Sequence, residues 1–257
     1  MANAKEIQKM ILAYLTGFNE TKFRYGGFTD QEQLIIKQAL WVMEQYQNNF
    51  YIVRMPNPTI ELVKTIVREN VMMHDVEYVF YDYIFISPSL LNEFKGFNLR
   101  NDEILLMFST ALKDLAVELN IFMMSSTQVN ANADNNQNIR NEGSIAGSRS
   151  IINKADIGAI MARPTKEELE FLQNEDGISF QPNIVTDIYK VRSGEWNQVR
   201  IWSDVNLGNL RKRDLFVTNA RMEVLNDVGG SFNYQASWED DVVTELTAQL
   251  KVVNELK

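Results

Sequence analysis

The chain has 257 residues, 45% hydrophobic and 23% charged, a composition typical of globular proteins and unlike that of disordered or collagen-like chains. Its 25 basic and 34 acidic residues give a formal net charge of -9, so any contact with nucleic acid must be local. The lack of cysteine excludes disulfides, thiolate zinc sites and thiol nucleophiles, and a single histidine, His74, excludes multi-histidine metal sites. No apolar run reaches the length of a membrane span and no signal peptide is recognisable, so we expect a soluble, cytoplasmic protein without membrane contact.

The first elements expected along the chain are two amphipathic helices. Residues 4–17 have apolar side chains at helical spacing, and Gly17 stands just past the last of them. A second helix is expected from Thr29, where Glu32 three positions later completes a reciprocal N-terminal cap.

Strands and helices then alternate. We expect short strands at residues 50–55, 77–85 and 121–126, separated by helices over residues 59–74 and 101–120. Asn57 and Pro58 are expected to cap and begin the first of these helices. The strand at 77–85 is almost continuously apolar, which predicts burial on both faces. The order β, α, β, α, β predicts an α/β fold with a parallel sheet.

A long loop rich in asparagine, serine and glycine is expected over residues 128–150, directly after the third strand. Beyond it we expect a strand at 155–162, a short helix opening at Pro164, and a β-hairpin that turns near Ser193. The tail contains an acidic amphipathic helix, either docked or partner-binding. We divide the chain into a main domain over residues 1–205 and an extension over residues 206–257.

Three places in this pattern could carry chemistry. Asp82 interrupts an apolar strand and should lie at its carboxyl end, facing a cation or hydrogen-bond donors, or else act as a simple strand-end cap. Gln128 follows the next strand, where it could orient a water or sense a phosphate, or be a solvated loop residue. Lys190 and Arg192 alternate along a strand and suit a phosphate or a neighbour's nucleotide, or form an exposed basic edge.

The order of these motifs resembles that in the carboxyl-terminal motor domain of DnaB-type replicative DNA helicases, which has a RecA-like ATPase fold. YVFYDYIF resembles the family's Walker B strand, and KDLAVELNIFMMSSTQVN resembles its segment ending in Gln-x-Asn. SIAGSRSIINKADIGAIMA is similar to the stretch with the second DNA-binding loop, and IYKVRSG to the hairpin that supplies an arginine finger. The resemblance extends from Met1 to about Trp202.

The resemblance implies a role for each candidate residue. Asp82 would help to hold the Mg²⁺ of bound ATP, and Gln128 would couple the nucleotide state to the DNA loop. Arg192, with Lys190, would reach the γ-phosphate held by the adjacent subunit of a hexameric ring. Single-stranded DNA is the implied polymer, and a primase or a helicase loader is a further implied partner.

The same resemblance places DNA contacts near residues 145–150. The residues assigned to them are Arg140, Gly147, Ser148 and Arg149. Local contacts of this kind would let a chain of net charge -9 bind one strand through its phosphates. The family's loop arginine, however, aligns with Ala146, and Arg149 stands where glycine is usual.

The phosphate-binding motif G-x-x-x-x-G-K-S/T occurs nowhere among the twelve glycines. We therefore expect this P-loop and the catalytic glutamate, which would directly precede Met1, to come from another chain of a split helicase. The isolated chain would then be inactive. The alternatives are a non-hydrolysing RecA-like module that binds DNA or caps a helicase ring, and a structural protein with inherited remnants of the motifs.

Overall fold

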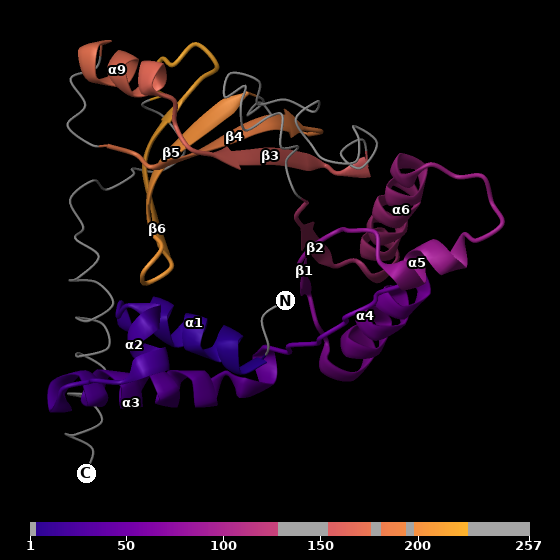
Figure 1. Ribbon diagram of the computed structural model, residues 1–257, viewed down its shortest axis with the longest axis horizontal. Helices are drawn as coiled ribbons and strands as arrows, with labels where there is room; N and C mark the ends of the chain where they lie inside the picture. Colours follow the sequence, from indigo (N-terminus) through magenta and orange to yellow (C-terminus); the bar gives the residue numbers. More distant parts are fainter. Residues whose placement is uncertain (1–3, 128–153, 176–180, 194–197, 226–257) are drawn as a thin grey trace. The chain divides into compact units, whose positions relative to one another are not determined.

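The computed structural model describes residues 4–127, 154–175, 181–193 and 198–225, and Figure 1 labels their helices and strands. The chain forms two compact units: Met1–Ile52, Leu172–Ile184 and Ile201–Lys257 make the first, and Val53–Phe171 with Val185–Arg200 makes the second. The predicted boundary between residues 205 and 206 stays a prediction. In the ranges described, no helix combines the length and apolar character that crossing a membrane requires.

Three helices open the first unit: α1 (Ala4–Thr16), α2 (Glu20–Tyr25) and α3 (Asp30–Gln45). A 3₁₀ turn, η1 (Gln47–Asn49), follows. The predicted cap is confirmed: the Glu32 amide donates to Thr29 Oγ1 at 3.3 Å, and the Thr29 amide donates to Glu32 Oε2 at 2.8 Å. Gly17, at φ +74°, follows α1 in a backbone conformation that favours glycine. Both helices therefore begin or end where local sequence signals place them.

The second unit contains α4 (Ile60–His74), β1 (Tyr78–Tyr81), α5 (Pro88–Glu93), α6 (Asn101–Leu119) and β2 (Phe122–Ser125). β1 and β2 pair in parallel, with Tyr78 opposite Phe122 and Tyr81 opposite Ser125. The predicted crossover through a helix is thus confirmed for these two strands.

Two expectations before β1 are wrong. Residues 50–55 form no strand, because a β-branched and aromatic run becomes a strand only where a neighbour can pair with it. The N-terminal cap of α4 is Thr59, whose side chain accepts the Leu62 amide at 3.2 Å, in place of the expected Asn57 and Pro58.

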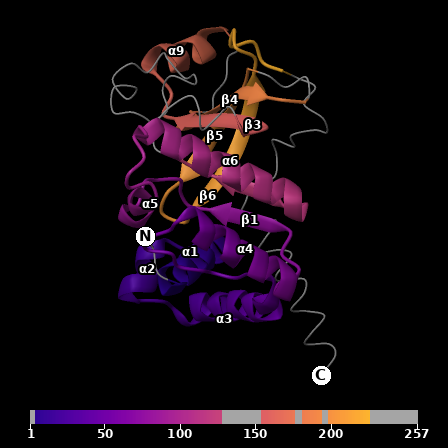
Figure 2. The ribbon, with the colours of Figure 1, turned by 90° about the vertical axis from the view of Figure 1, so that its right-hand side faces the viewer.

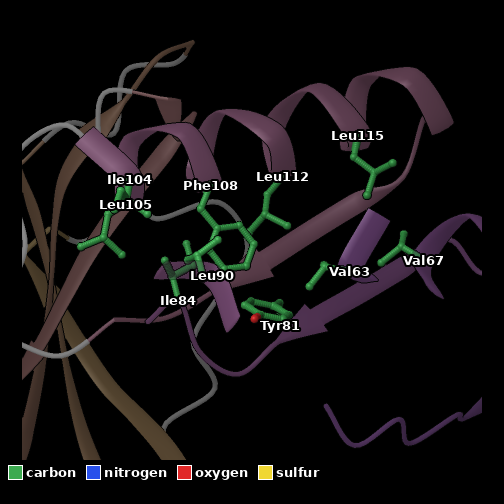
Figure 3. Packing of buried hydrophobic residues seen from close by; sticks show 10 residues of the cluster. All are labelled: Val63, Val67, Tyr81, Ile84, Leu90, Ile104, Leu105, Phe108, Leu112 and Leu115. Atoms are coloured by element: carbon green, nitrogen blue, oxygen red, sulfur yellow. The ribbon is translucent and has the colours of Figure 1, made fainter. Parts of the chain in front are cut away.

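The core of the second unit lies between the β1–β2 pair and the helices α4 and α6. Phe108 and Leu112 of α6 point toward Tyr81 of β1 in Figure 3, and Val63 of α4 and Leu90 of α5 belong to the same cluster of ten buried residues. Figure 2 shows α6 and α4 beside β1. The core residues of α6 share one helical stripe, so burying them fixes how that helix lies on the strands.

Only one face of the β1–β2 pair is covered in this way. Tyr78, Phe80, Phe122 and Met124 alternate with the core residues and stay 63%, 67%, 51% and 55% exposed. The expectation that the strand at 77–85 is buried on both faces is therefore wrong for the described residues. The strand is also shorter than expected, because its pairing with β2 ends at Tyr81.

The carboxyl-terminal half of the chain contains β3 (Ile157–Ala162), α9 (Lys166–Glu175), β4 (Ile184–Val191), β5 (Val199–Asn206) and β6 (Arg211–Thr218). The strands form a four-stranded sheet in the order β3-β4-β5-β6, with β3 antiparallel to β4. The expected hairpin is confirmed, because the Gln198 amide donates to the Ile188 carbonyl at 2.8 Å and the Asn183 amide to the Ser203 carbonyl at 3.0 Å.

The start of α9 differs slightly from the expectation. The helix begins at Lys166, two residues after Pro164, because Thr165 and Glu168 exchange cap hydrogen bonds of 2.8 and 3.1 Å. The expected loop over residues 128–150 and the acidic helix of the tail lie outside the described residues.

Candidate functional site

Asp82 directly follows β1, as its position in the apolar run predicts. Its carboxylate is exposed, and Oδ1 accepts a hydrogen bond of 3.4 Å from the Ser126 hydroxyl, which directly follows β2. The Ile84 amide donates to the Ser126 carbonyl at 3.0 Å, so the chain beyond β1 stays attached to the chain beyond β2. The Asp82–Tyr83 peptide bond is cis. The ends of two parallel strands thus place a carboxylate and a hydroxyl at one edge.

In open α/β sheets, ligands usually bind in the crevice beyond the carboxyl ends of the parallel strands. Asp82 and Ser126 lie at this edge. Gln128 follows Ser126 by two residues and lies outside the described residues, as do Arg140, Gly147, Ser148 and Arg149. The roles expected for these five residues stay predictions.

Lys190 and Arg192 lie at the end of β4, in the other sheet. Lys190 is half-buried within the strand, and Arg192 is exposed directly after it. The two cations thus lie at alternate positions at the end of β4, with Arg192 one residue beyond the strand. The chain therefore presents its carboxylate and its two cations on different sheets.

Asp156, which directly precedes β3, is a partner of Arg192 and was not among the expected site residues. Its backbone carbonyl accepts the Arg192 amide at 2.8 Å, and its Oδ1 accepts the Arg192 Nη1 group at 3.1 Å. Its other oxygen, Oδ2, accepts a short hydrogen bond from Lys113 of α6. The two contacts join residues 43 and 36 positions apart, so no local pattern in the sequence could have indicated them.

These cations change the acidity of Asp156. The hydrogen bond from Lys113 lowers the pKa of the Asp156 carboxyl most, and the charges of Lys113, Arg192 and Lys190 lower it further. Asp156 therefore stays ionised throughout the physiological pH range. Three basic groups near the end of β4 therefore act on this one carboxylate.

The side-chain oxygens at the β1 edge, from Asp82 and Ser126, could serve as ligands for a magnesium ion bound to a nucleotide. Mg²⁺ prefers oxygen ligands and usually takes one or two protein carboxylates while phosphates and water complete its shell. An exposed Asp82 beside a serine hydroxyl matches that requirement. Among the described residues, no group of three or more acidic or histidine side chains could hold a metal by itself.

The parallel strand pair and the helices packed on it form an α/β fold with a carboxylate at the carboxyl ends of its strands, an arrangement typical of RecA-like folds. Residues 1–210 match the family described as DnaB-like helicase C terminal domain, and the chain belongs to this family. The matched range includes Asp82, Lys190 and Arg192.

Two solved structures share this fold. One, described as an ATPase domain, matches with a TM-score of 0.64 and 16% identity, over 82% of this chain and 70% of that one. The other, a DnaB-like replicative helicase described together with its interactions with primase, matches with a TM-score of 0.63 and 17% identity, over 81% of this chain and 47% of that one. The agreement at so low an identity confirms the RecA-like fold expected from the motifs.

A curated relative comes from Bacillus subtilis (strain 168). It is described as an SPbeta prophage-derived uncharacterized protein, YorI, and is 31% identical over 230 residues. The match covers 86% of this chain and 45% of the relative, so the chain spans less than half of the length of that relative.

Proposed function

We propose that the chain is the distal part of a replicative DNA helicase that couples ATP hydrolysis to movement along single-stranded DNA in a hexameric ring. The single observation that carries this proposal is the position of Asp82 at the carboxyl edge of the β1–β2 pair, beside Ser126. Membership of the helicase family supports the same assignment.

Asp82 is the residue of this chain that would hold Mg²⁺. When bound with ATP, the ion neutralises the charge that develops on the phosphoryl oxygens during transfer. The Ser126 hydroxyl donates to the Asp82 carboxylate and so restrains its direction. Gln128, two residues further on, is proposed to sense the state of the nucleotide and to pass it to the loop that contacts DNA. That loop would contribute Arg140, Gly147, Ser148 and Arg149.

Arg192 and Lys190 are proposed to act on the nucleotide of the adjacent subunit. A guanidinium offers a planar pair of donors to the oxygens of a phosphoryl group, so Arg192 suits the stabilisation of charge as the bond breaks. Lys190 adds a second positive charge from the same strand. Their place on the sheet that lacks Asp82 supports a division of labour between neighbouring subunits.

The nucleotide's phosphates also need the loop motif G-x-x-x-x-G-K-S/T, which the 257 residues do not contain. We propose that a segment outside these 257 residues supplies the P-loop and the catalytic glutamate, and that the chain acts in a homo- or hetero-oligomeric ring. A primase or a helicase loader is a further proposed partner, in line with the primase named for one of the structural neighbours.

The first test is ATP hydrolysis stimulated by single-stranded DNA. The chain is assayed alone and together with a polypeptide that carries the P-loop and the catalytic glutamate, with Asp82→Asn and Arg192→Ala as variants. Arg24→Ala is the control, because Arg24 forms an exposed ion pair with Glu20 on α2. We expect hydrolysis only in the mixture, loss of it in both site variants, and no change in the control.

A mixture of the two site variants tests action between subunits. Each variant keeps the residue that the other lacks, so about a quarter of the interfaces in a random ring would combine an intact Asp82 with an intact Arg192. Recovery of hydrolysis in this mixture supports a finger acting in trans. Silence of every mixture, with binding to single-stranded DNA retained, would instead identify a non-hydrolysing RecA-like module.

A further inference from the structure

Asp156 forms hydrogen bonds with both the backbone and the side chain of Arg192. The backbone bond from the Arg192 amide to the Asp156 carbonyl extends the β3–β4 pairing by one position beyond Ile157 and Val191. The Asp156 carboxylate then accepts the guanidinium of the same residue at 3.1 Å. Asp156 therefore restrains both the backbone amide and the guanidinium of Arg192.

We propose that Asp156 is a positioning residue for Arg192, and that Lys113 makes the release of Arg192 to a phosphate possible. This inference rests on the proposed role of Arg192. Neither Asp156 nor Lys113 is assigned a function by the motifs or by the family relationship.

The geometry explains why Arg192 can leave Asp156 for a phosphate. Lys113 occupies Oδ2 of the carboxylate, so the carboxylate holds Arg192 through Oδ1 and not through both oxygens. A two-pronged pair would be stronger and harder to open. The side chains of Arg192 and Asp156 are 52% and 50% exposed, which keeps their pairing weak enough for competition.

Lys113 also keeps the Asp156 carboxylate paired with a cation when Arg192 leaves it. When Arg192 turns from Asp156 to a phosphate oxygen, the carboxylate keeps its hydrogen bond from Lys113 and remains neutralised. Arg192 therefore exchanges one anionic partner for another, and no charge loses its counter-ion. The charge of Lys190 also lowers the pKa of Asp156.

The pairing itself is tested in the 257-residue chain by carbon NMR of the side-chain carboxyls. Asp156→Asn identifies the Asp156 signal, and the pH is lowered stepwise in the wild type, Lys113→Gln and Arg192→Gln. We expect the pKa of Asp156 to lie below its ordinary value and to rise in both variants, more in Lys113→Gln. A pKa of Asp156 that is unchanged by Arg192→Gln would overturn the proposal.

The functional consequence is tested in the ATPase mixture. Asp156→Asn is expected to lower kcat about tenfold at an unchanged KM for ATP, because a misplaced finger acts on the transition state rather than on binding. Asp156→Glu should recover part of the loss. The matched control is Glu118→Gln, because Glu118 is an exposed, ion-paired carboxylate on α6, the helix that carries Lys113.

A double variant separates positioning from a general effect on the fold. If Asp156 acts through Arg192, Asp156→Asn causes no further loss in an Arg192→Ala background. An equal loss in both backgrounds, or wild-type kcat for Asp156→Asn, would contradict the proposal. Silence of the wild-type mixture would refute the proposed function instead, and the NMR titration would then decide the pairing.

Discussion

Tyr81 is buried to 8% exposure at the end of β1, with its ring edge-on to Phe108 at 5.6 Å between centroids. Its hydroxyl finds no hydrogen-bond partner among the described residues. Because an unpaired buried hydroxyl loses its bonds to water, Tyr81→Phe should leave the free energy of unfolding unchanged or raise it by about 1 kcal/mol. Urea denaturation checks this, with the exposed Tyr78→Phe as control. A loss above about 1 kcal/mol would show that the hydroxyl has a partner.

The same burial predicts a response to alkaline pH. Burial raises the pKa of Tyr81 from 10.0 to about 12. The folded state then keeps a proton that the unfolded state has lost, so this stabilisation is complete below pH 10 and disappears as the pH rises toward 12. We expect the free energy of unfolding to fall across this range in the wild type and to fall less in Tyr81→Phe. The measurement is urea denaturation of both proteins at stepped pH. If the prediction is wrong, the free energy of unfolding will fall equally with pH in the wild type and in Tyr81→Phe.

At the scale of elements, Arg211 of β6 fixes the end of α1. Its guanidinium donates to the carbonyls of Tyr14 and Leu15 at 2.9 and 3.1 Å, which satisfies two acceptors that the last helical turn leaves free. The guanidinium also lies close beside Gly17, where a Cβ would approach it to 3.1 Å. Arg211 therefore serves the fold of the first unit.

Arg211→Gln should lower the free energy of unfolding by about 1–2 kcal/mol, because both carbonyls lose a charged donor. Lys37→Gln on α3 removes an equal charge and serves as the control. Thermal melts of both variants provide the measurement. Equal melting temperatures for Arg211→Gln and the wild type would mean that water replaces the guanidinium without loss.

Some helix boundaries were predictable from local signals, whereas the start of α4 was not, because Thr59 caps it in place of Asn57. The Thr29–Glu32 cap and the position of Gly17 depend on neighbours within a few residues, and the structure confirms both. The expected strand at 50–55 failed because a strand depends on a distant partner that local sequence does not contain. The parallel pair succeeded because the helix between its strands constrains their direction.

The same distinction applies to the candidate site. Asp82 was predictable because a single carboxylate in an apolar run already indicates a strand end. The link of Asp156 to Lys113 and Arg192 was not, because it depends on how α6, β3 and β4 come together in space. The residues proposed to touch a nucleotide leave local traces in the sequence. Asp156 lies within a stretch that resembles the family, but its contacts with Lys113 and Arg192 leave no such trace.

At the scale of the whole molecule, the bare face of the β1–β2 pair is the least expected feature. Parallel sheets are almost always covered on both faces, yet the face that carries Tyr78, Phe80, Phe122 and Met124 is exposed in the described residues. The rings of Tyr78 and Phe80 lie 5.9 and 6.4 Å from that of Phe122, which makes a continuous apolar patch. Such patches promote association.

We therefore expect the isolated chain to bind the dye ANS and to associate with increasing concentration, as measured by fluorescence and light scattering. Phe80→Ser and Phe122→Ser should reduce both signals, because each removes a ring from the patch. Phe97→Ser is the matched control, since Phe97 is 69% exposed but follows α5 and lies outside the strand pair. If the polypeptide that carries the P-loop covers this face, adding it should suppress both signals as well. A monodisperse monomer that binds no dye and melts cooperatively would contradict this prediction, because it would show that the patch is already covered in solution.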